Sequence, residues 1–262
     1  MKLLFLLLTP LLLFSKVHYA KVEPYENIIL KSAVSAQVIQ AKIDQEGRTI
    51  SGSIIKLDDK LDKTKLASSQ ASIKLIKKMI TTNQNILTSL QESLIRQEDY
   101  YNRISTIASA SRTQKDNAFY GFTNAKTQYF STKEKIDSLK KQKLDLNYEV
   151  ARLKDSIAKK SIVVKNKFLY KLLVNRGDFV NMGTPLAQLK DLTSAKLVLF
   201  LETEELKNIK KRTIYIDDKP TEYKISKIWK IADEKFISSY RTEIVIKNPK
   251  ESFSKLLKVE FK

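Results

Sequence analysis

The chain has 262 residues, of which 48 are basic and 29 acidic, with no cysteine and a single histidine, His18. The lack of cysteine excludes disulfides, thiolate metal sites and thiol catalysis, and one histidine cannot build a histidine-based catalytic or metal site. The formal charge of +19 would suit nucleic acid, but the lysines are spread among acidic residues along the whole chain, as on solvated helix surfaces. We therefore expect no enzyme, no cofactor, no metal and no nucleic-acid partner.

The N-terminus resembles a secretory signal peptide. Lys2 is followed by an apolar run from Leu3 to Phe14 and then by a polar stretch that ends at Ala20. This order predicts a signal over residues 1–20 with cleavage after Ala20. The run is shorter than the roughly 20 residues that usually cross a bilayer, although retention as a membrane anchor is the alternative. Both interpretations predict that the rest of the chain is exported.

Four of the five glycines occur in two similar stretches, DQEGRTISGSIIKLDD (44–59) and NRGDFVNMGTPLAQLKD (175–191). Apolar and polar residues alternate around each stretch, which predicts half-buried strands. We expect the glycines to lie where strands turn sharply, because glycine adopts positive φ at the least cost. The predicted turn residues are Gly47, Gly52, Gly177, Asp178 and Gly183. Residues 21–58 and 159–192 then form two halves of one small β-sandwich, because either alone is too small to bury a face.

Residues 59–158, between these halves, are predicted to form a helical hairpin. The segment from Asp59 to Ile157 has no proline, and its one glycine is Gly121. Apolar residues recur in steps of three and four over 73–108 and again over 118–157, the pattern of a coiled coil. The small and polar stretch at about 108–116 interrupts the repeat and predicts a tip between antiparallel helices, each roughly 70 Å long at 1.5 Å per residue.

Folding the hairpin at this tip sets its expected register. Leu87 should lie near Ile136, and Ile73 near Val150. The polar residues Asn83 and Lys143 then fall at the same level of the seam, where they could fix the register or form a wet patch.

Residues 193–262 are predicted to form a small β-barrel. Turn residues at Asp217–Pro220 and Asn248–Pro249 separate short runs of β-branched and apolar residues. A helical turn is expected near 204–209. The predicted strands are 196–201, 213–216, 222–231, 242–246 and 257–261.

This order of segments resembles the periplasmic adaptor, or membrane fusion protein, family (HlyD-like, including adaptor subunits of RND-type efflux). The resemblance rests chiefly on NRGDFVNMGTPLAQLKD and more weakly on DQEGRTISGSIIKLDD, which has one residue fewer between its glycines. It implies a multidomain α+β fold: a lipoyl-like β-sandwich (barrel-sandwich hybrid) split by a coiled-coil hairpin and followed by a β-barrel. ADEKFISSYRTEIVI, at 232–246, is similar to an element of the family's barrel domain.

The resemblance extends to the hairpin tip, RISTIASASRTQKD. Family members often carry an Arg and two aliphatic residues before the turn, and a Ser and an Asp after it. The matching residues are Arg103, Ile104, Ile107, Ser111 and Asp116. The resemblance implies that this tip docks with a TolC-like outer-membrane channel. The alternative is that Arg103 is a solvated charge and Ser111 a helix N-cap.

The resemblance implies a periplasmic protein of a Gram-negative bacterium, associated with the inner membrane. Its implied partners are an inner-membrane transporter of RND or ABC type, the outer-membrane channel and further copies of itself in a ring, for example a hexamer. A lipoyl or biotinyl carrier is disfavoured, because helices occupy the place where a modified lysine would be presented. An exported coiled-coil scaffold without a transport role remains the alternative, but it leaves the two glycine stretches unexplained.

Overall fold

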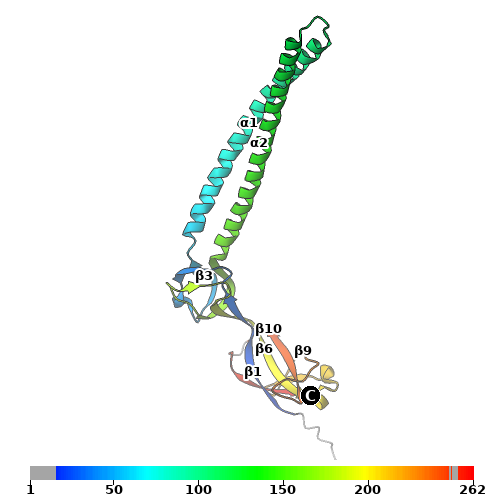
Figure 1. Cartoon of the computed structure of the whole chain (residues 1–262). Coiled ribbons are helices and arrows are strands. Elements are labelled where there is room, and N and C mark those ends of the chain that lie inside the picture. Colours follow the sequence, from blue (N-terminus) through cyan, green and yellow to red (C-terminus); the bar gives the residue numbers. More distant parts are fainter. Residues whose placement is uncertain (1–15, 248, 250–252) are drawn as a thin grey trace, which may run out of the picture. The chain divides into compact units, whose positions relative to one another are not determined.

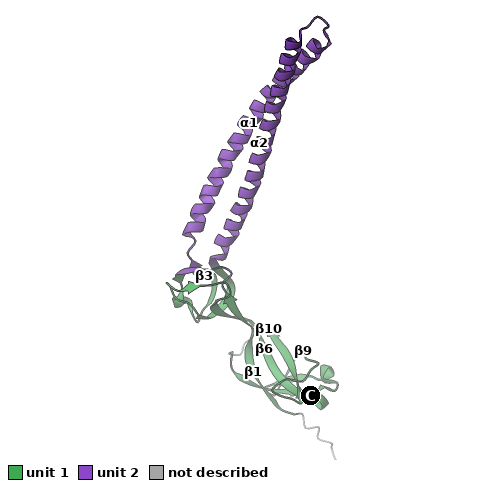
Figure 2. Cartoon of the chain, in the orientation of Figure 1, with its two compact units in different colours: residues 1–32, 40–55, 162–262 green, residues 33–39, 56–161 purple. Residues whose placement is uncertain are grey.

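Two long helices joined by a short loop occupy the middle of the chain. The computed structural model describes residues 16–247, 249 and 253–262. Helix α1 (Lys60–Thr106) and helix α2 (Arg112–Lys159) run side by side in opposite directions (Figure 1). They make up most of one of two compact units, residues 33–39 and 56–161 (Figure 2). The predicted helical hairpin is confirmed, with its ends close to the expected residues.

The two helices meet along a narrow apolar seam. Ile80, Ile136 and Leu139 form a buried cluster, against which Ile76 and Leu87 pack. The predicted proximity of Leu87 and Ile136 is therefore confirmed. The buried residues of α1 are Ser69, Ile73, Ile80 and Asn83, and those of α2 are Ala118, Ala125, Ile136, Leu139 and Leu153.

Asn83 is buried in this seam and satisfies its amide within its own helix. Its Nδ2 donates a hydrogen bond to the Met79 carbonyl oxygen, one turn earlier, at 2.7 Å. Lys143, the polar residue expected opposite it, is not needed for this bond. Asn83 thus avoids the cost of an unpaired buried amide.

The other unit, residues 1–32, 40–55 and 162–262, consists mainly of antiparallel strands (Figure 2). Together with the hairpin they confirm the α+β class. The strands of the chain are β1 (His18–Lys31), β2 (Ala36–Ala41), β3 (Thr49–Leu57), β4 (Ser161–Leu172), β5 (Phe179–Val180), β6 (Pro185–Glu202), β7 (Ile214–Ile216), β8 (Lys219–Thr221), β9 (Ile225–Ile228), β10 (Ser239–Lys247) and β11 (Leu256–Phe261). Short helical segments lie at η1 (Ile43–Gln45), α3 (Thr203–Leu206) and η2 (Ile209–Lys211).

Strands β1 and β6 are long and change partners along their length. The start of β1 pairs with β11, from His18 opposite Val259, and the rest pairs with β6 from Val22 opposite Leu197. The first half of β6 pairs with β4 and its second half with β10. The boundary predicted between residues 192 and 193 therefore lies inside β6, and the cleavage point predicted after Ala20 lies inside β1.

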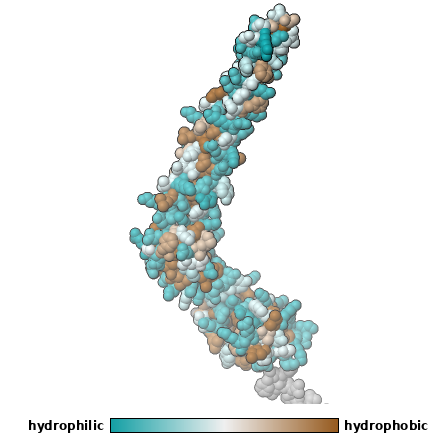
Figure 3. Space-filling view, in the orientation of Figure 1, coloured by the Kyte–Doolittle hydropathy of each residue, from teal (hydrophilic) through white to brown (hydrophobic). Residues whose placement is uncertain are grey.

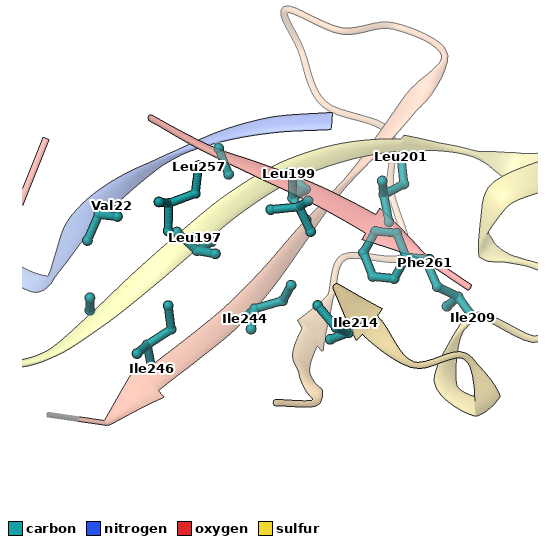
Figure 4. Close-up of a cluster of buried hydrophobic side chains, with 13 residues drawn as sticks. Val22, Leu197, Leu199, Leu201, Ile209, Ile214, Ile244, Ile246, Leu257 and Phe261 are labelled. Carbon is teal, nitrogen blue, oxygen red and sulfur yellow. The ribbon is translucent and has the colours of Figure 1, made fainter. Parts of the chain in front are cut away.

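The second half of β6 shows why these residues form a sheet with one buried face. Ala195, Leu197, Leu199 and Leu201 are all buried, and the residues between them are not, the period of two expected of a strand. They pack with residues from β1, η2, β7, β10 and β11 in a cluster that we call the strand core (Figure 4). Its buried members are Ala20, Val22, Ala195, Leu197, Leu199, Leu201, Ile209, Ile214, Ile244, Ile246, Leu257, Val259 and Phe261.

Most of the strands expected after residue 193 are present, with two differences. The strand predicted over 222–231 is limited to β9, Ile225–Ile228. Strand β8 was not predicted, because Pro220 was assigned to the turn; the turn itself is at Asp217 and Asp218, which have φ values of 48° and 64°. Asn248, part of another predicted turn, is outside the described residues. Closure of these strands as a barrel, and of the glycine-rich halves as a lipoyl-like sandwich, stays a prediction.

Most of the predicted signal, residues 1–15, is also outside the described residues. Within the part of the chain that the structure describes, no helix combines the length and the apolar content needed to span a membrane.

Candidate functional site: the hairpin tip

The tip is formed by the residues that link α1 to α2. Ser111 is the N-cap of α2, and its Oγ accepts a hydrogen bond from the Gln114 backbone N–H at 3.2 Å. In return the Gln114 Oε1 accepts from the Ser111 N–H at 2.8 Å. This capping box satisfies two N–H groups that have no partner within the helix. The N-cap interpretation of Ser111 is confirmed.

Three of the predicted docking residues belong to the end of α1. Arg103 lies exposed in its last turn, where a positive charge complements the partial negative charge of the helix C-terminus. Ile104 is half-buried, whereas Ile107, whose N–H donates to the Ile104 carbonyl at 3.3 Å, has 43% of its surface exposed. The structure thus presents a guanidinium and an aliphatic side chain to solvent at the tip.

Asp116, the fifth predicted residue, lies in the first turns of α2. Its carboxylate is 3.9 Å from the Arg112 guanidinium, and its side chain remains 59% exposed. The structure therefore places all five residues at one end of the hairpin without a direct side-chain bond among them. Their role in docking stays a prediction.

An aromatic cluster next to the tip was missed by the sequence analysis. The Tyr101 ring, from α1, stacks on Phe122 of α2, with centroids 5.7 Å apart and an interplanar angle of 4°. Phe119 contacts both Tyr101 and Tyr120, with centroid distances of 5.7 and 6.1 Å. Phe119 is 48% exposed and Tyr120 63%. We call Tyr101, Phe119, Tyr120 and Phe122 the aromatic cluster.

Gly121 lies in the middle of this cluster, close to a side chain of α1. A Cβ atom placed on Gly121 would lie 2.8 Å from Oε1 of Gln97, on α1. Glycine in a helix interior costs roughly 1 kcal/mol relative to alanine, but Oε1 is the far end of a flexible side chain, so Gln97 could move aside for a Cβ atom. The run FYGF, with the only glycine of the hairpin, was the signal in the sequence that could have indicated this contact.

Charge is distributed unevenly along the hairpin. Residues 92–130, around the tip, contain five basic and four acidic residues, whereas residues 60–91 and 131–159 contain fourteen basic and six acidic residues. The space-filling view shows hydrophilic and hydrophobic side chains alternating along the hairpin surface (Figure 3). The tip is therefore nearly neutral and carries exposed aromatic and aliphatic groups, while the rest of the hairpin is strongly basic.

The opposite end of the hairpin, its base, is held by polar contacts between the helices. Asp62 of α1 accepts a hydrogen bond from Ser156 Oγ at 2.8 Å and pairs with Lys160 at 2.9 Å. Hydrogen bonds from Lys160 and Ser156 lower the pKa of Asp62 from its ordinary value. These contacts fix the end of the hairpin where the chain leaves for the strands.

Glu149 makes a second link at the base. It pairs with Lys65 across the helices at 2.8 Å and with Arg152 on its own helix at 2.9 Å. Hydrogen bonds from Arg152 and Lys65 lower the pKa of Glu149 to about 2, because they favour the ionised carboxylate.

The second glycine-rich stretch consists of two consecutive turns of the same design. The Asn175 N–H donates to Asp178 Oδ2 at 2.7 Å, and the Asn181 N–H donates to Thr184 Oγ1 at 3.0 Å. The third residue of each turn is a glycine with positive φ, 100° at Gly177 and 87° at Gly183. The repetition of one turn explains the spacing of these glycines.

The first glycine-rich stretch is built differently. Gly47 has a φ of 76° and donates its N–H to the Leu169 carbonyl at 2.8 Å. The neighbouring Glu46 accepts a hydrogen bond from the Leu172 N–H at 2.6 Å, so this turn binds β4. Gly52, with a φ of 128°, lies within β3 and not at a turn, which differs from the expectation.

Comparison with known proteins finds structural likeness without sequence likeness. No model of a known protein family matches the sequence, and no curated protein matches it. Among solved structures, MacA from Actinobacillus actinomycetemcomitans superposes with a TM-score of 0.73 at 13% identity, over 95% of this chain and 78% of that one.

Two further structures share the same arrangement. A MacA–MexA chimera containing the α-hairpin domain of Pseudomonas aeruginosa MexA gives a TM-score of 0.54 at 14% identity, over 95% of this chain and 81% of that one. The periplasmic adaptor protein EmrA gives 0.50 at 15% identity, over 94% and 99%. None of these proteins is described as an enzyme. Because identities this low establish the fold alone, the conclusion is that this chain has the fold of the periplasmic adaptor proteins.

Proposed function

We propose that the protein is the periplasmic adaptor of a tripartite efflux or secretion system. In this role it joins an inner-membrane transporter, of RND or ABC type, to a TolC-like outer-membrane channel. The observation that carries the proposal is the tip of the hairpin, where Arg103 and Ile107 are exposed to solvent. The likeness to EmrA, described as a periplasmic adaptor, supports the same role.

The chemistry of the tip suits a protein partner. The guanidinium of Arg103 offers five donors to carbonyl or carboxylate oxygens, and exposed aliphatic side chains can fill small pockets. Phe119 and Tyr120 extend this surface from the tip along α2, and aromatic residues and arginine are the types that contribute most at protein interfaces. Residues 92–130 are nearly neutral, so this end can approach a basic partner surface without strong repulsion. The rest of the hairpin is basic and would be repelled by such a surface.

The proposal includes self-association into a ring, for example a hexamer. Several hairpins would stand side by side as a sleeve, with their tips on the channel and their strands above the transporter. Sedimentation of the purified protein with its transporter and channel checks this step. A protein that stays monomeric in every combination contradicts the ring.

Cysteine crosslinking in intact cells tests docking directly, because the chain has no cysteine of its own. Ser111 is a poor position, since it caps α2. Ser109 is exposed in the tip loop, and Gln142 is also exposed, on the shaft of α2. We expect S109C, but not Q142C, to form an adduct with an outer-membrane channel.

A second substitution separates docking from simple proximity. In the S109C background, Arg103→Ala should lower the adduct yield several-fold, because the guanidinium contacts are lost. Arg96→Ala is the matched control, since Arg96 is an exposed arginine of the same helix, 4.0 Å from Glu92. Equal yields from both variants would remove Arg103 from the proposed surface. The absence of any adduct, in cells that contain a channel, would favour the exported coiled-coil scaffold.

A further inference from the structure

The apolar seam between α1 and α2 has two sides, and an ion pair identifies one of them. In heptad terms the seam residues occupy positions a and d, and Lys65 and Glu149 occupy position g, directly before a seam residue. Their side chains pair across the helices at 2.8 Å. In an antiparallel pair of helices, position g faces position g and position e faces position e. The e positions therefore lie on the opposite side of the seam from this ion pair.

Lysine occupies position e repeatedly, and on both helices. Such a lysine directly follows position d of the seam, as Lys77 follows Ile76 on α1 and Lys140 follows the buried Leu139 on α2. Lys74, at position b and one turn before Lys77, lies on the same side. These side chains are all exposed. We call the set the lysine row: Lys74, Lys77, Lys133, Lys140 and Lys154.

The lysines of α1 fall between Lys140 and Lys154 of α2. This follows from the contact of Leu87 with the cluster around Ile136, because residues ten and thirteen positions before Leu87 lie level with residues ten and thirteen positions after Ile136. The row extends from Lys133 to Lys154 over about 32 Å, at 1.5 Å per residue and in steps of about 10 Å or less. The two helices together thus form one continuous line of positive charge.

This arrangement opposes the stability of the hairpin. Helices that pair along a seam usually carry opposite charges at the flanking positions, and like charges three or four residues apart on a helix repel. Lys140 has an acidic neighbour in Asp137, at 3.1 Å. The other four lysines of the row make no ion pair with a residue that the structure describes. A charge pattern that costs local stability is expected at a functional surface.

The excess of positive charge is confined to one side of the shaft. Nearer the tip, Glu98 and Lys126 both occupy position e at nearly the same level, so their charges balance. On the opposite side of the seam Glu149 neutralises Lys65. Lysines that alternate with acidic residues in the sequence are therefore sorted by the fold onto one side.

We propose that the lysine row binds an acidic glycan, a linear polysaccharide that carries carboxylates. Charge complementarity requires an anion, and the length of the row favours a linear one. Bound carboxylates lie between the lysines of the two helices and cancel their repulsion. Binding therefore stabilises the hairpin, and it is independent of docking at the hairpin tip.

A glycan fits the row better than a protein or a nucleic acid. Protein interfaces are depleted in lysine and enriched in arginine and aromatic residues, whereas the row is made of lysine alone. The phosphates of a nucleic acid strand are about 3.4 Å apart, much closer than these lysines. A glycan spaces its carboxylates by whole sugar rings, which suits the wider spacing of the row.

Binding of defined polymers to the full chain tests the proposal. Polygalacturonate carries a carboxylate on every sugar, and its fully methyl-esterified form has the same backbone without the charge. Polyphosphate carries more closely spaced charges. Each polymer is labelled with a fluorophore, and its binding is followed by anisotropy at several salt concentrations.

We expect polygalacturonate to bind, and its methyl ester not to bind. Lys77→Gln combined with Lys133→Gln and Lys140→Gln should lower the affinity for polygalacturonate at least ten-fold at low salt. The slope of log affinity against log salt should become shallower by about 2, because three fewer ions are released at roughly 0.7 per contact.

A matched control removes the same charge from elsewhere on the shaft. Lys78, Lys135 and Lys141 are exposed on the same two helices but lie outside positions e and b. The combined variant K78Q, K135Q and K141Q should bind polygalacturonate within about two-fold of the parent. An equal loss in both triple variants overturns the proposal, because binding then follows net charge alone. Tighter, row-dependent binding of polyphosphate also overturns it and assigns the row to a phosphate polymer.

Thermal unfolding at the helix band of circular dichroism gives a second readout. Polygalacturonate should raise the midpoint of the parent, and its methyl ester should not. The row variant without polymer should melt at or above the parent, since the repulsion is removed, and should not respond to polygalacturonate. A row variant that melts well below the parent would show that these lysines serve folding, and the proposal would fail.

Discussion

The hairpin and the strand core bury apolar surface in very different ways. Helices α1 and α2, with 47 and 48 residues, bury four and five side chains along one seam. The strand core buries thirteen residues drawn from β1, β6, η2, β7, β10 and β11, which are far shorter elements. A hairpin of this kind extends the reach of the protein at little cost in buried residues, whereas the strands supply most of the stability. This division predicts where substitutions have their largest effects.

Truncation of the strand core should have the largest effect. Leu197 is fully buried, and Leu197→Ala should lower the free energy of unfolding by about 2–5 kcal/mol. Leu139→Ala, in the hairpin seam, should lower the free energy of unfolding by about 2 kcal/mol or less, because fewer residues surround Leu139. Urea unfolding followed by fluorescence reports the strands, since the only tryptophan is Trp229, and circular dichroism at the helix band reports the hairpin.

The two probes make this comparison testable. We expect Leu197→Ala to shift mainly the fluorescence transition and Leu139→Ala mainly the helical transition. If both variants shift both transitions equally, the two regions unfold as one unit and the division of roles is wrong.

Loss of the helix cap at the tip should have an intermediate effect. Ser111→Ala removes the acceptor for the Gln114 N–H and should cost about 1 kcal/mol. Amide hydrogen exchange should quicken in the first turn of α2 and remain unchanged at the base. Ser109→Ala, in the same loop but outside the capping box, is the control, and similar exchange in both variants would contradict the role of the cap.

The ion pairs at the base should have the smallest effect, and this effect should disappear in acid. The folded-state pKa of Glu149 is about 2, below its ordinary 4.5, so its contribution is fully present above pH 4.5 and is lost as the pH falls towards 2. Glu149→Gln should therefore weaken the hairpin at pH 6 but differ little from the parent at pH 2, as measured by the helical transition. Glu98→Gln, which removes an exposed carboxylate that makes no ion pair with a described residue, should show no such window.

The sequence was sufficient to predict the hairpin and most of the strands. The absence of proline from 59–157 and the recurrence of apolar residues in steps of three and four specify the helices and their buried faces. The small and polar stretch at about 108–116 specifies the break, although α2 already begins at Arg112. The alternation of buried and less buried residues over Leu197–Leu201 likewise indicates a strand with one buried face. These features depend on neighbours within a few residues, so local patterns reveal them.

Other features were decided by contacts between distant residues. Gly52 was expected at a turn but lies in β3, the strand expected over 222–231 is limited to Ile225–Ile228, and Ala20, which precedes the predicted cleavage point, is buried in the strand core. Each depends on which strand lies opposite, and the pairing of strands that are distant in the sequence leaves no period of its own. The tertiary structure alone therefore determined where Gly52 lies, the change of partners along β1 and β6, and the burial of Ala20.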